Sequence, residues 1–253
     1  MASLQYQLNG NYKHECGATI ISDKFLLTAA HCVYGKNVSD FKVILGTDKL
    51  NFRSSSATEH NLLNISIHPS YEPLYFYNDT AVLELEETLN FNLTQSPICL
   101  PKYFDNDQNS RHQITGTVTG WGAMQNFGQA STELRQARVT IFSQEYCNKS
   151  RTVENEHGVI VTNNKLPKLF QSEVLCAGYE AGLSGVTCGG DSGGPLVVYD
   201  SITDQYTQVG IVTGGSCASV RKSSIFARLE DPNIFQFVNN VAFDQRFVII
   251  KKC

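Results

Sequence analysis

Residues 188–195 read Cys-Gly-Gly-Asp-Ser-Gly-Gly-Pro, a tight turn that holds one serine, Ser192, among four glycines. Glycine allows positive φ angles and lets another molecule approach the backbone closely. Pro195 ends the turn and directs the chain into the apolar run 196–198. A serine held there can present a nucleophilic hydroxyl and adjacent backbone N–H groups to one carbonyl group, as acyl transfer requires. The alternative is a glycine-rich β-turn with an incidental serine.

The composition is that of a folded chain rather than a disordered one. Of its 253 residues, 42% are hydrophobic and 17% are charged. The net charge is −4 and no basic block is long enough for a nucleic-acid surface, so we expect no nucleic-acid partner. No apolar run approaches the roughly 18 residues of a spanning helix, so we expect no membrane span.

The cysteines indicate an oxidising compartment. Their number is even, they are scattered along the chain, and no Cys-x-x-Cys pair suggests a zinc site, so disulfides are favoured. Five Asn-x-Ser/Thr sequons also fit a secreted protein. The cysteines are Cys16, Cys32, Cys99, Cys147, Cys176, Cys188, Cys217 and Cys253, and the sequons begin at Asn37, Asn64, Asn78, Asn92 and Asn148.

The first residues point in another direction. Residues 1–7, Met-Ala-Ser-Leu-Gln-Tyr-Gln, lack the basic stretch and the apolar segment of a signal peptide. We expect the chain to be a fragment of a longer precursor that is secreted to the extracellular space. The alternative is a cytosolic protein with eight reduced thiols.

Short strands separated by turns recur in two halves of the chain and predict an all-β barrel or sandwich. A polar stretch at residues 105–111 separates the halves as a linker. The strand candidates are 4–8, 17–28 (two strands around a turn), 41–45, 62–67 and 80–85 in the first half, and 112–122, 134–141, 195–199, 206–213 and 224–229 in the second.

Local signals mark several boundaries between these elements. Asn9–Gly10 predicts a hairpin turn, and residues 29–32 predict a single helical turn. Asp231–Pro232 is a good N-cap and first-turn pair for a closing helix over 233–243. The polar residues 148–168 predict an inserted surface loop.

A serine nucleophile needs a histidine base and a group that orients the base. No histidine follows Ser192, which excludes the Ser–Asp–His order of α/β-hydrolases despite the Gly-x-Ser-x-Gly match at 190–194. His31, beside two small alanines, is the best base, and His68 is the alternative. Asp79 opens onto an apolar strand and is the best orienting carboxylate, although Asn-Asp is also an ordinary turn pair.

Four segments together resemble the chymotrypsin-like (trypsin-type) serine proteases: 28–32 (Thr-Ala-Ala-His-Cys), 78–83 (Asn-Asp-Thr-Ala-Val-Leu), 119–122 (Thr-Gly-Trp-Gly) and 190–195. The resemblance runs from near residue 1 to about residue 243. It implies an all-β fold of two six-stranded antiparallel β-barrels packed face to face, with a C-terminal helix. The implied peptidase domain is 1–243, with barrels at about 1–104 and 112–230, a helix at about 232–243 and a tail at 244–253.

The resemblance also assigns roles in the reaction. His31 would be the general base and acid, Asp79 would orient it, and Ser192 would attack the scissile carbonyl. The N–H groups of Gly190 and Ser192 would form the oxyanion hole. We therefore expect a serine endopeptidase that acts on proteins or peptides through an acyl-enzyme and that meets protein inhibitors. The alternative is a non-catalytic homologue of the same fold that acts as a binding module.

Three disulfides are implied as well, namely Cys16–Cys32, Cys147–Cys176 and Cys188–Cys217. Cys99 stands where relatives tether an N-terminal extension, so we expect it to bond a pro-region or Cys253. The resemblance allows a calcium site in a loop that bears carboxylates. The corresponding stretch 47–61 offers only Asp48 and Glu59 as acids, so no metal is expected, and no cofactor is expected either.

The residues that read the substrate follow by position. Val186 would form the base of the primary pocket, followed by Thr187, and because burying a cation beside Val186 is costly, we expect cleavage after an uncharged, apolar residue. Gly214 stands where the family usually has tryptophan. The wall positions are Thr213, Gly214, Gly215 and Ser224.

Asp191 is the residue that the family links to activation. In family members the corresponding carboxylate pairs with the ammonium of an Ile-Val-Gly-Gly-like N-terminus that cleavage frees. The given sequence shows no such segment before Met1. Because an unpaired buried carboxylate is unfavourable, we expect the chain to lack its activation segment and to be inactive or weakly active as written.

Overall fold

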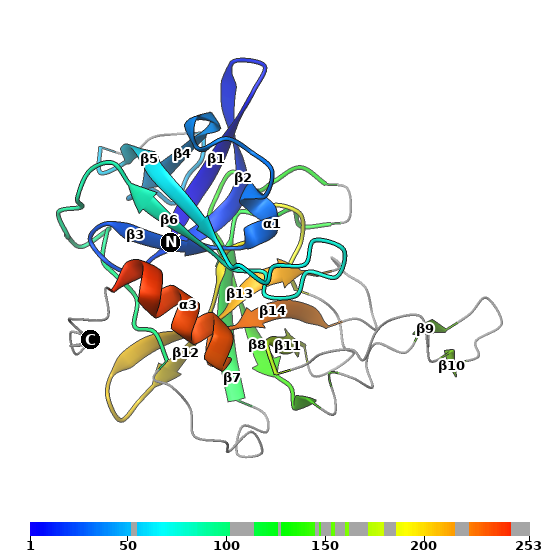
Figure 1. Cartoon of the computed structure of the whole chain (residues 1–253). Coiled ribbons are helices and arrows are strands. Elements are labelled where there is room, and N and C mark those ends of the chain that lie inside the picture. The colour runs from blue at the N-terminus through cyan, green and yellow to red at the C-terminus, as the bar shows by residue number, and fades with distance from the viewer. Residues whose placement is uncertain are drawn as a thin grey trace.

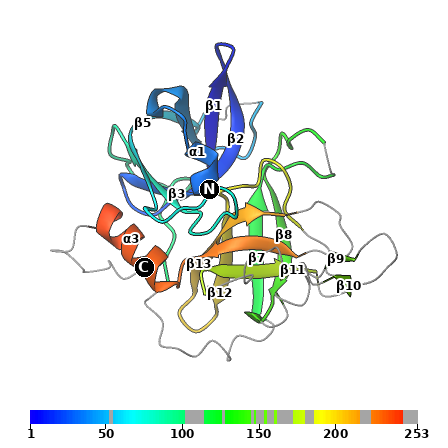
Figure 2. The ribbon, with the colours of Figure 1, turned by 45° about the vertical axis from the view of Figure 1, so that its right-hand side comes forward.

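The computed structural model describes residues 1–51, 55–101, 114–125, 128–144, 147, 153–154, 160–161, 172–179, 186–215 and 223–243. These residues form two closed barrels of six antiparallel strands each, with one helix after the second barrel. Figure 2 shows the N-terminal barrel above the C-terminal barrel, with the helix at their side. The predicted all-β fold class is confirmed.

The N-terminal barrel closes in the order β1-β2-β3-β6-β5-β4, and β4 pairs back with β1. Positive φ angles at Asn9 (51°) and Gly10 (80°) make the predicted hairpin turn between the first two strands. The strands are β1 (Ala2–Leu8), β2 (Asn11–Ile20), β3 (Phe25–Thr28), β4 (Phe41–Leu45), β5 (Thr58–Ile67) and β6 (Ala81–Leu85), and the short helices are α1 (Ala30–Val33) and η1 (Val38–Asp40).

The C-terminal barrel closes in the order β11-β14-β13-β12-β7-β8. Its strand β11 was not predicted, because all five of its residues are buried and an apolar run without alternation does not identify a strand. The strands are β7 (Ile114–Gly120), β8 (Arg135–Ile141), β11 (Val174–Gly178), β12 (Pro195–Asp200), β13 (Gln205–Gly214) and β14 (Ser224–Arg228).

Two very short strands, β9 (Val153–Glu154) and β10 (Ile160–Val161), pair within the segment predicted as an inserted loop. The rest of that segment, the predicted linker and the tail 244–253 lie outside the described residues.

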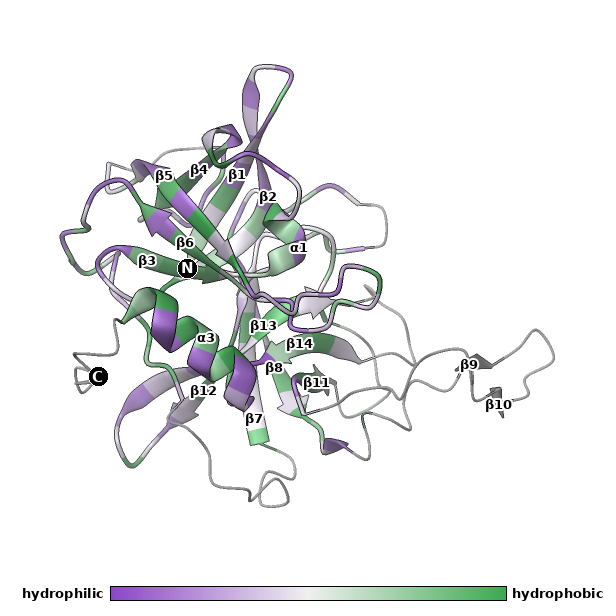
Figure 3. Cartoon of the chain, viewed as in Figure 1, coloured by the Kyte–Doolittle hydropathy of each residue, from purple (hydrophilic) through white to green (hydrophobic). Residues whose placement is uncertain are grey.

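The C-terminal helix α3 (Pro232–Ala242) follows the C-terminal barrel in the sequence and lies alongside both barrels (Figure 1). Its N-terminus is capped by Asp231, whose carboxylate accepts the N–H of Asn233 at 3.0 Å. Its buried stripe, Ile234, Val238 and Ala242, joins the same apolar cluster as the N-terminal barrel core. Figure 3 shows the apolar and polar sides of this helix. The same cluster contains Ile211 of β13 and Ala227 of β14, so the helix contacts both halves.

The structure contains the Cys16–Cys32 and Cys147–Cys176 disulfides. Cys99 and Cys188 are also disulfide-bonded, and none of the described cysteines is free. Cys217 and Cys253 lie outside the described residues, so the pairings predicted for them stay predictions. No helix in the described part of the chain is both long and apolar enough to cross a membrane.

Candidate active site

His31 and Asp79 meet because the strands that carry them are neighbours. His31 lies in α1 directly after β3, Asp79 lies just before β6, and Thr28 of β3 pairs with Ala81 of β6. The fully buried Asp79 accepts the backbone N–H of His31 on Oδ1 at 2.8 Å, and its Oδ2 lies 2.7 Å from His31 Nδ1. A carboxylate only accepts, so Nδ1 carries the proton and Nε2 is left as the basic nitrogen.

His68, the alternative base, is engaged elsewhere. Its Nδ1 accepts the N–H of Ser70 at 3.1 Å, and its Nε2 donates to the carbonyl of Asn233 in α3 at 3.4 Å. Its ring packs edge-on against Phe237. Burial lowers the pKa of His68, opposed by the Asn233 hydrogen bond and the charge of Asp231, so the neutral ring holds this contact between barrel and helix.

The turn of Ser192 lies against the segment that leads to His31. The N–H of Gly17 donates to the Ser192 carbonyl at 2.7 Å. Gly193 has φ +76°, and a Cβ there would overlap the Thr28 hydroxyl and the Gly17 carbonyl. Glycine at 193 therefore lets the serine turn pack on the end of β3. No hydrogen bond joins Ser192 Oγ to His31 in the part of the chain that the structure describes.

Two backbone donors remain available in this turn. The N–H groups of residues 191, 193 and 194 donate to backbone carbonyls at 2.8–3.0 Å. Those of Gly190 and Ser192 donate to no described acceptor. These two N–H groups lie on either side of Asp191 and close in sequence to the Ser192 hydroxyl, so they can stabilise an oxyanion that forms there.

His14 holds the carbonyl side of the same turn and was missed as a site residue. Its Nε2 donates to the Gly190 carbonyl at 2.8 Å, and its Nδ1 accepts from the Ser3 hydroxyl at 2.8 Å. Its ring packs edge-on against Trp121, and burial lowers its pKa, opposed by the Gly190 bond and the charge of Glu15. No local pattern marks His14, because its partner Gly190 lies 176 residues away.

Asp191 is buried beside the serine with backbone donors only. Oδ1 accepts the N–H of Gly122 at 2.7 Å and Oδ2 accepts that of Cys188 at 2.9 Å. Burial raises the pKa of Asp191, and these two hydrogen bonds oppose the rise. None of the described cations forms an ion pair with it. A Cβ at Gly120 or Gly122 would overlap the Asp191 carboxylate, which explains the glycines of the 119–122 segment.

The expected pocket residues form a hydrogen-bonded group around Ser224. Its Oγ accepts the N–H groups of Val186 at 3.0 Å and Thr187 at 3.1 Å, and it accepts the Thr187 hydroxyl at 2.9 Å. Ser224 and Thr187 are buried, whereas Val186 is partly exposed. A Cβ at Gly215 would overlap the Thr187 hydroxyl, while a Cβ at Gly214 would meet nothing within 4 Å. The nearby Thr213 hydroxyl turns back to the Ile211 carbonyl at 3.4 Å.

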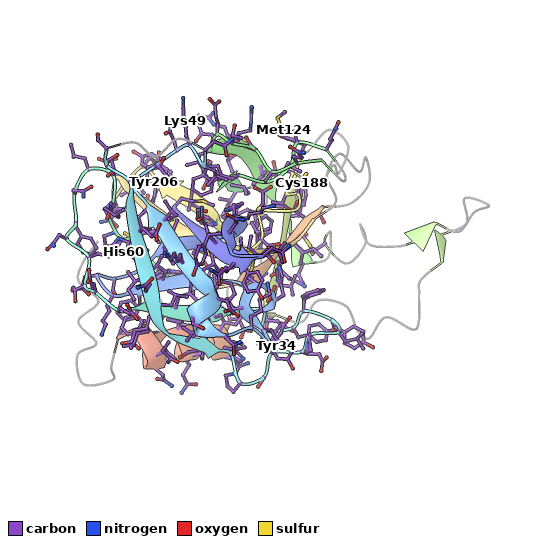
Figure 4. The ribbon with its side chains drawn as sticks, turned by 90° about the horizontal axis from the view of Figure 1, so that it is seen from above. Tyr34, Lys49, His60, Met124, Cys188 and Tyr206 are labelled. Carbon is purple, nitrogen blue, oxygen red and sulfur yellow. A yellow bond between two sulfur atoms is a disulfide. The ribbon has the colours of Figure 1, made fainter. Side chains whose placement is uncertain are left out.

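An exposed aromatic loop lies next to His31 and was also missed. The ring of Phe76, which has φ 57°, packs edge-on against that of His31 at 5.4 Å between centroids. Leu74 and Tyr75 before it are exposed. Figure 4 shows Tyr34, which follows α1, at the lower edge of the molecule, Cys188, which precedes the serine turn, at the right, and His60 at the left. The apolar run 74–77 directly before Asn78–Asp79 is the sequence signal for this loop.

The described residues contain one cluster of metal-ligand atoms, Cys16, His31 and Cys32, which lie within 4.8 Å of one another. Because the two sulfurs are bonded to each other, the cluster has no thiolate to offer a metal.

Residues 1–235 match the family model described as Trypsin. Over 230 residues the chain is 34% identical to Transmembrane protease serine 11A of Homo sapiens. Over 227 residues it is 32% identical to Transmembrane protease serine 9 of Rattus norvegicus. These alignments cover 90% and 89% of this chain but 49% and 20% of the relatives, so the chain spans half or less of their length. The chain belongs to the trypsin family of serine proteases.

Proposed function

We propose that this chain is a serine endopeptidase. Ser192 Oγ attacks the scissile carbonyl while His31 Nε2 takes its proton, and the N–H groups of Gly190 and Ser192 hold the oxyanion. His31 then gives the proton to the leaving amine, and a water activated by His31 hydrolyses the acyl-enzyme. The observation that carries the proposal is the double hydrogen bond of Asp79 to His31, next to a serine turn packed on the same strand end.

The substrate preference that we propose is an uncharged, apolar residue before the cut. Among the described residues, no acidic side chain belongs to the group around Ser224 and Val186, so a cationic side chain would be buried there without a partner. Ser224 Oγ already accepts the Thr187 hydroxyl and two backbone N–H groups and has no lone pair left for a cationic donor, which favours an apolar occupant. The open space at Gly214 leaves one wall unfilled.

A direct test of this preference compares peptides that differ only in that residue. Val186→Asp introduces a carboxylate at the pocket base and is expected to shift cleavage toward lysine and arginine. Faster cleavage after lysine or arginine by the unchanged protein would refute the preference.

We further propose one peptidase domain at 1–243 with a tail at 244–253, acting outside the cell on proteins or peptides and subject to protein inhibitors. The disulfide-bonded cysteines support an oxidising compartment. A disulfide of Cys99 to a pro-region or to Cys253 belongs to the same proposal.

The experiment that tests catalysis is covalent labelling by a fluorophosphonate. Ser192 is expected to take the label, at most weakly in the chain as written, and Ser192→Ala and His31→Ala are expected to lose it. Thermal unfolding of each variant reports whether it is folded. Labelling that survives in folded Ser192→Ala would refute the assignment.

The second candidate is a non-catalytic homologue that binds proteins. It is favoured by two observations on the described residues: none of their cations pairs with Asp191, and no hydrogen bond joins Ser192 to His31. Labelling of this chain and of one extended by Ile-Val-Gly-Gly plus the residues needed to reach Met1 separates the two candidates. Labelling of the extended form alone supports a protease that needs an ammonium at Asp191, and labelling of neither folded form supports the binding module.

A further inference from the structure

Three Asn-x-Ser/Thr sequons lie on the surface of the N-terminal barrel and take no part in the site. Asn37 directly precedes η1, Asn64 lies on β5, and Asn92 lies in the connection after β6, and all three side chains are exposed. An exposed apolar side chain stands within three residues of each asparagine in the sequence. These neighbours are Tyr34, Leu63 and Leu93.

Asn92 has the most open surroundings of the three. Its Oδ1 accepts both the N–H and the hydroxyl of Thr94 at 2.8 Å, while its Nδ2 donates to no described acceptor. The intervening Leu93 is 105% exposed and the preceding Phe91 is 46% exposed. By contrast, the Nδ2 atoms of Asn37 and Asn64 lie 3.5 Å from Asp40 and 3.4 Å from Ser66. A bulky polar group on Asn92 Nδ2 would extend into solvent and cover the apolar side chains beside it.

We propose that Asn92 carries an N-linked glycan and that Asn37 and Asn64 are further glycosylation sites. In the transfer, Asn92 Nδ2 forms a bond to the anomeric carbon of a lipid-diphosphate-linked oligosaccharide. The bond from that carbon to the diphosphate oxygen breaks, the amide nitrogen loses one proton, and the lipid diphosphate leaves. All three asparagines belong to the N-terminal half of the chain, outside the turn of Ser192.

The sequon at Asn78 differs from these three and is expected to stay unmodified. Asn78 has φ 51°, and its Nδ2 donates to the Ser70 carbonyl at 3.1 Å. Its next two residues, Asp79 and Thr80, are fully buried, and Asp79 is bonded to His31. The Asn-x-Thr pattern here follows from the segment that positions Asp79. The fifth sequon, at Asn148, lies outside the described residues.

The test uses the full chain fused to a removable N-terminal signal peptide and secreted from eukaryotic cells. Enzymatic release of N-glycans in ¹⁸O-water, followed by peptide mass spectrometry, marks each occupied asparagine as ¹⁸O-aspartate. Label is expected at Asn92, Asn37 and Asn64 and not at Asn78.

Asn92→Gln and Thr94→Ala are each expected to remove one glycan from the intact mass. Asn90→Gln is the matched control, because Asn90 is exposed two residues away and starts no sequon. Ser192→Ala should carry the same glycans as the unchanged chain, so this result is independent of catalysis. If Asn92 is unlabelled in secreted protein that has an intact Cys16–Cys32 disulfide, the proposal is wrong. If Asn78 is labelled as strongly as Asn92, the expectation that Asn78 stays unmodified is wrong.

Discussion

Each barrel buries one aspartate of the candidate site, and the two carboxylates are held in different ways. Asp79 bonds the ring and the backbone of His31, a side chain that can carry the opposite charge. Asp191 bonds only the backbone N–H groups of Gly122 and Cys188. A buried charge is unfavourable unless it is paired, and burial accordingly raises the pKa of Asp191.

The two halves of the molecule therefore contribute to the site in different ways. The N-terminal barrel supplies a side-chain pair whose chemistry is set by direct hydrogen bonds. The C-terminal barrel supplies backbone geometry, namely a turn that fits only because residues 120, 122 and 193 lack side chains. Substitutions in the first half should therefore change proton transfer, and those in the second half should change the shape of the oxyanion site.

The largest effect is expected from Asp79→Asn. Asparagine presents an amide group that cannot accept both N–H groups of His31, so the ring is held in the wrong tautomer and turnover should fall about 10⁴-fold. The measurement is kcat on a peptide substrate, with exposed Asp48→Asn as the matched control. A loss smaller than tenfold in the folded variant would contradict the role of Asp79.

Gly122→Ala is expected to act on the other carboxylate. The new Cβ overlaps Asp191, so the turn must shift, which should cost about 1–3 kcal/mol of unfolding free energy and about 10²-fold in labelling rate. Urea unfolding and fluorophosphonate labelling measure the two effects. Gly189→Ala, where a Cβ meets nothing within 4 Å, should change neither.

His14→Ala should have a smaller effect through the same turn. The Gly190 carbonyl loses its donor, so the peptide that precedes Asp191 is less well held and kcat should fall about tenfold. His14→Gln keeps a donor within reach and should recover part of the loss. Equal activity of His14→Ala and the unchanged protein would show that His14 only fills space.

The smallest effect is a pair of opposite pH dependences of stability. Burial lowers the pKa of His68 from 6.5, so the unfolded chain binds more protons and stability is lost as pH falls below about 6.5. Burial raises the pKa of Asp191 from 3.8, so the folded chain binds more protons and this contribution is lost as pH rises above about 3.8.

Urea midpoints measured against pH test both signs. His68→Gln should reduce the loss of unfolding free energy as pH falls below about 6.5. Asp191→Asn should reduce the loss of unfolding free energy as pH rises above about 3.8. A slope that stays unchanged in either variant would assign that dependence to other groups.

Much of the fold was predictable because its signals are local. Alternation identified most of the strands, positive φ explains the Asn9–Gly10 turn, and Asp231 caps α3 as expected. Strand β11 was not predicted, because burial on both faces removes the alternation of apolar and polar residues. The order and spacing of the motifs predicted the two barrels through the family resemblance, and the structure confirms them.

Side-chain type, glycine content and turn propensity are properties of short segments, so the residues with the chemistry for acyl transfer could be identified from the sequence. Which of them meet depends on the folded arrangement of the whole chain. Barrel closure pairs β3 with β6 and so joins His31 to Asp79, 48 residues apart. The contact between the barrels brings His14 to Gly190. Such pairings depend on strand order and packing across the whole chain, and no short stretch of sequence contains that information.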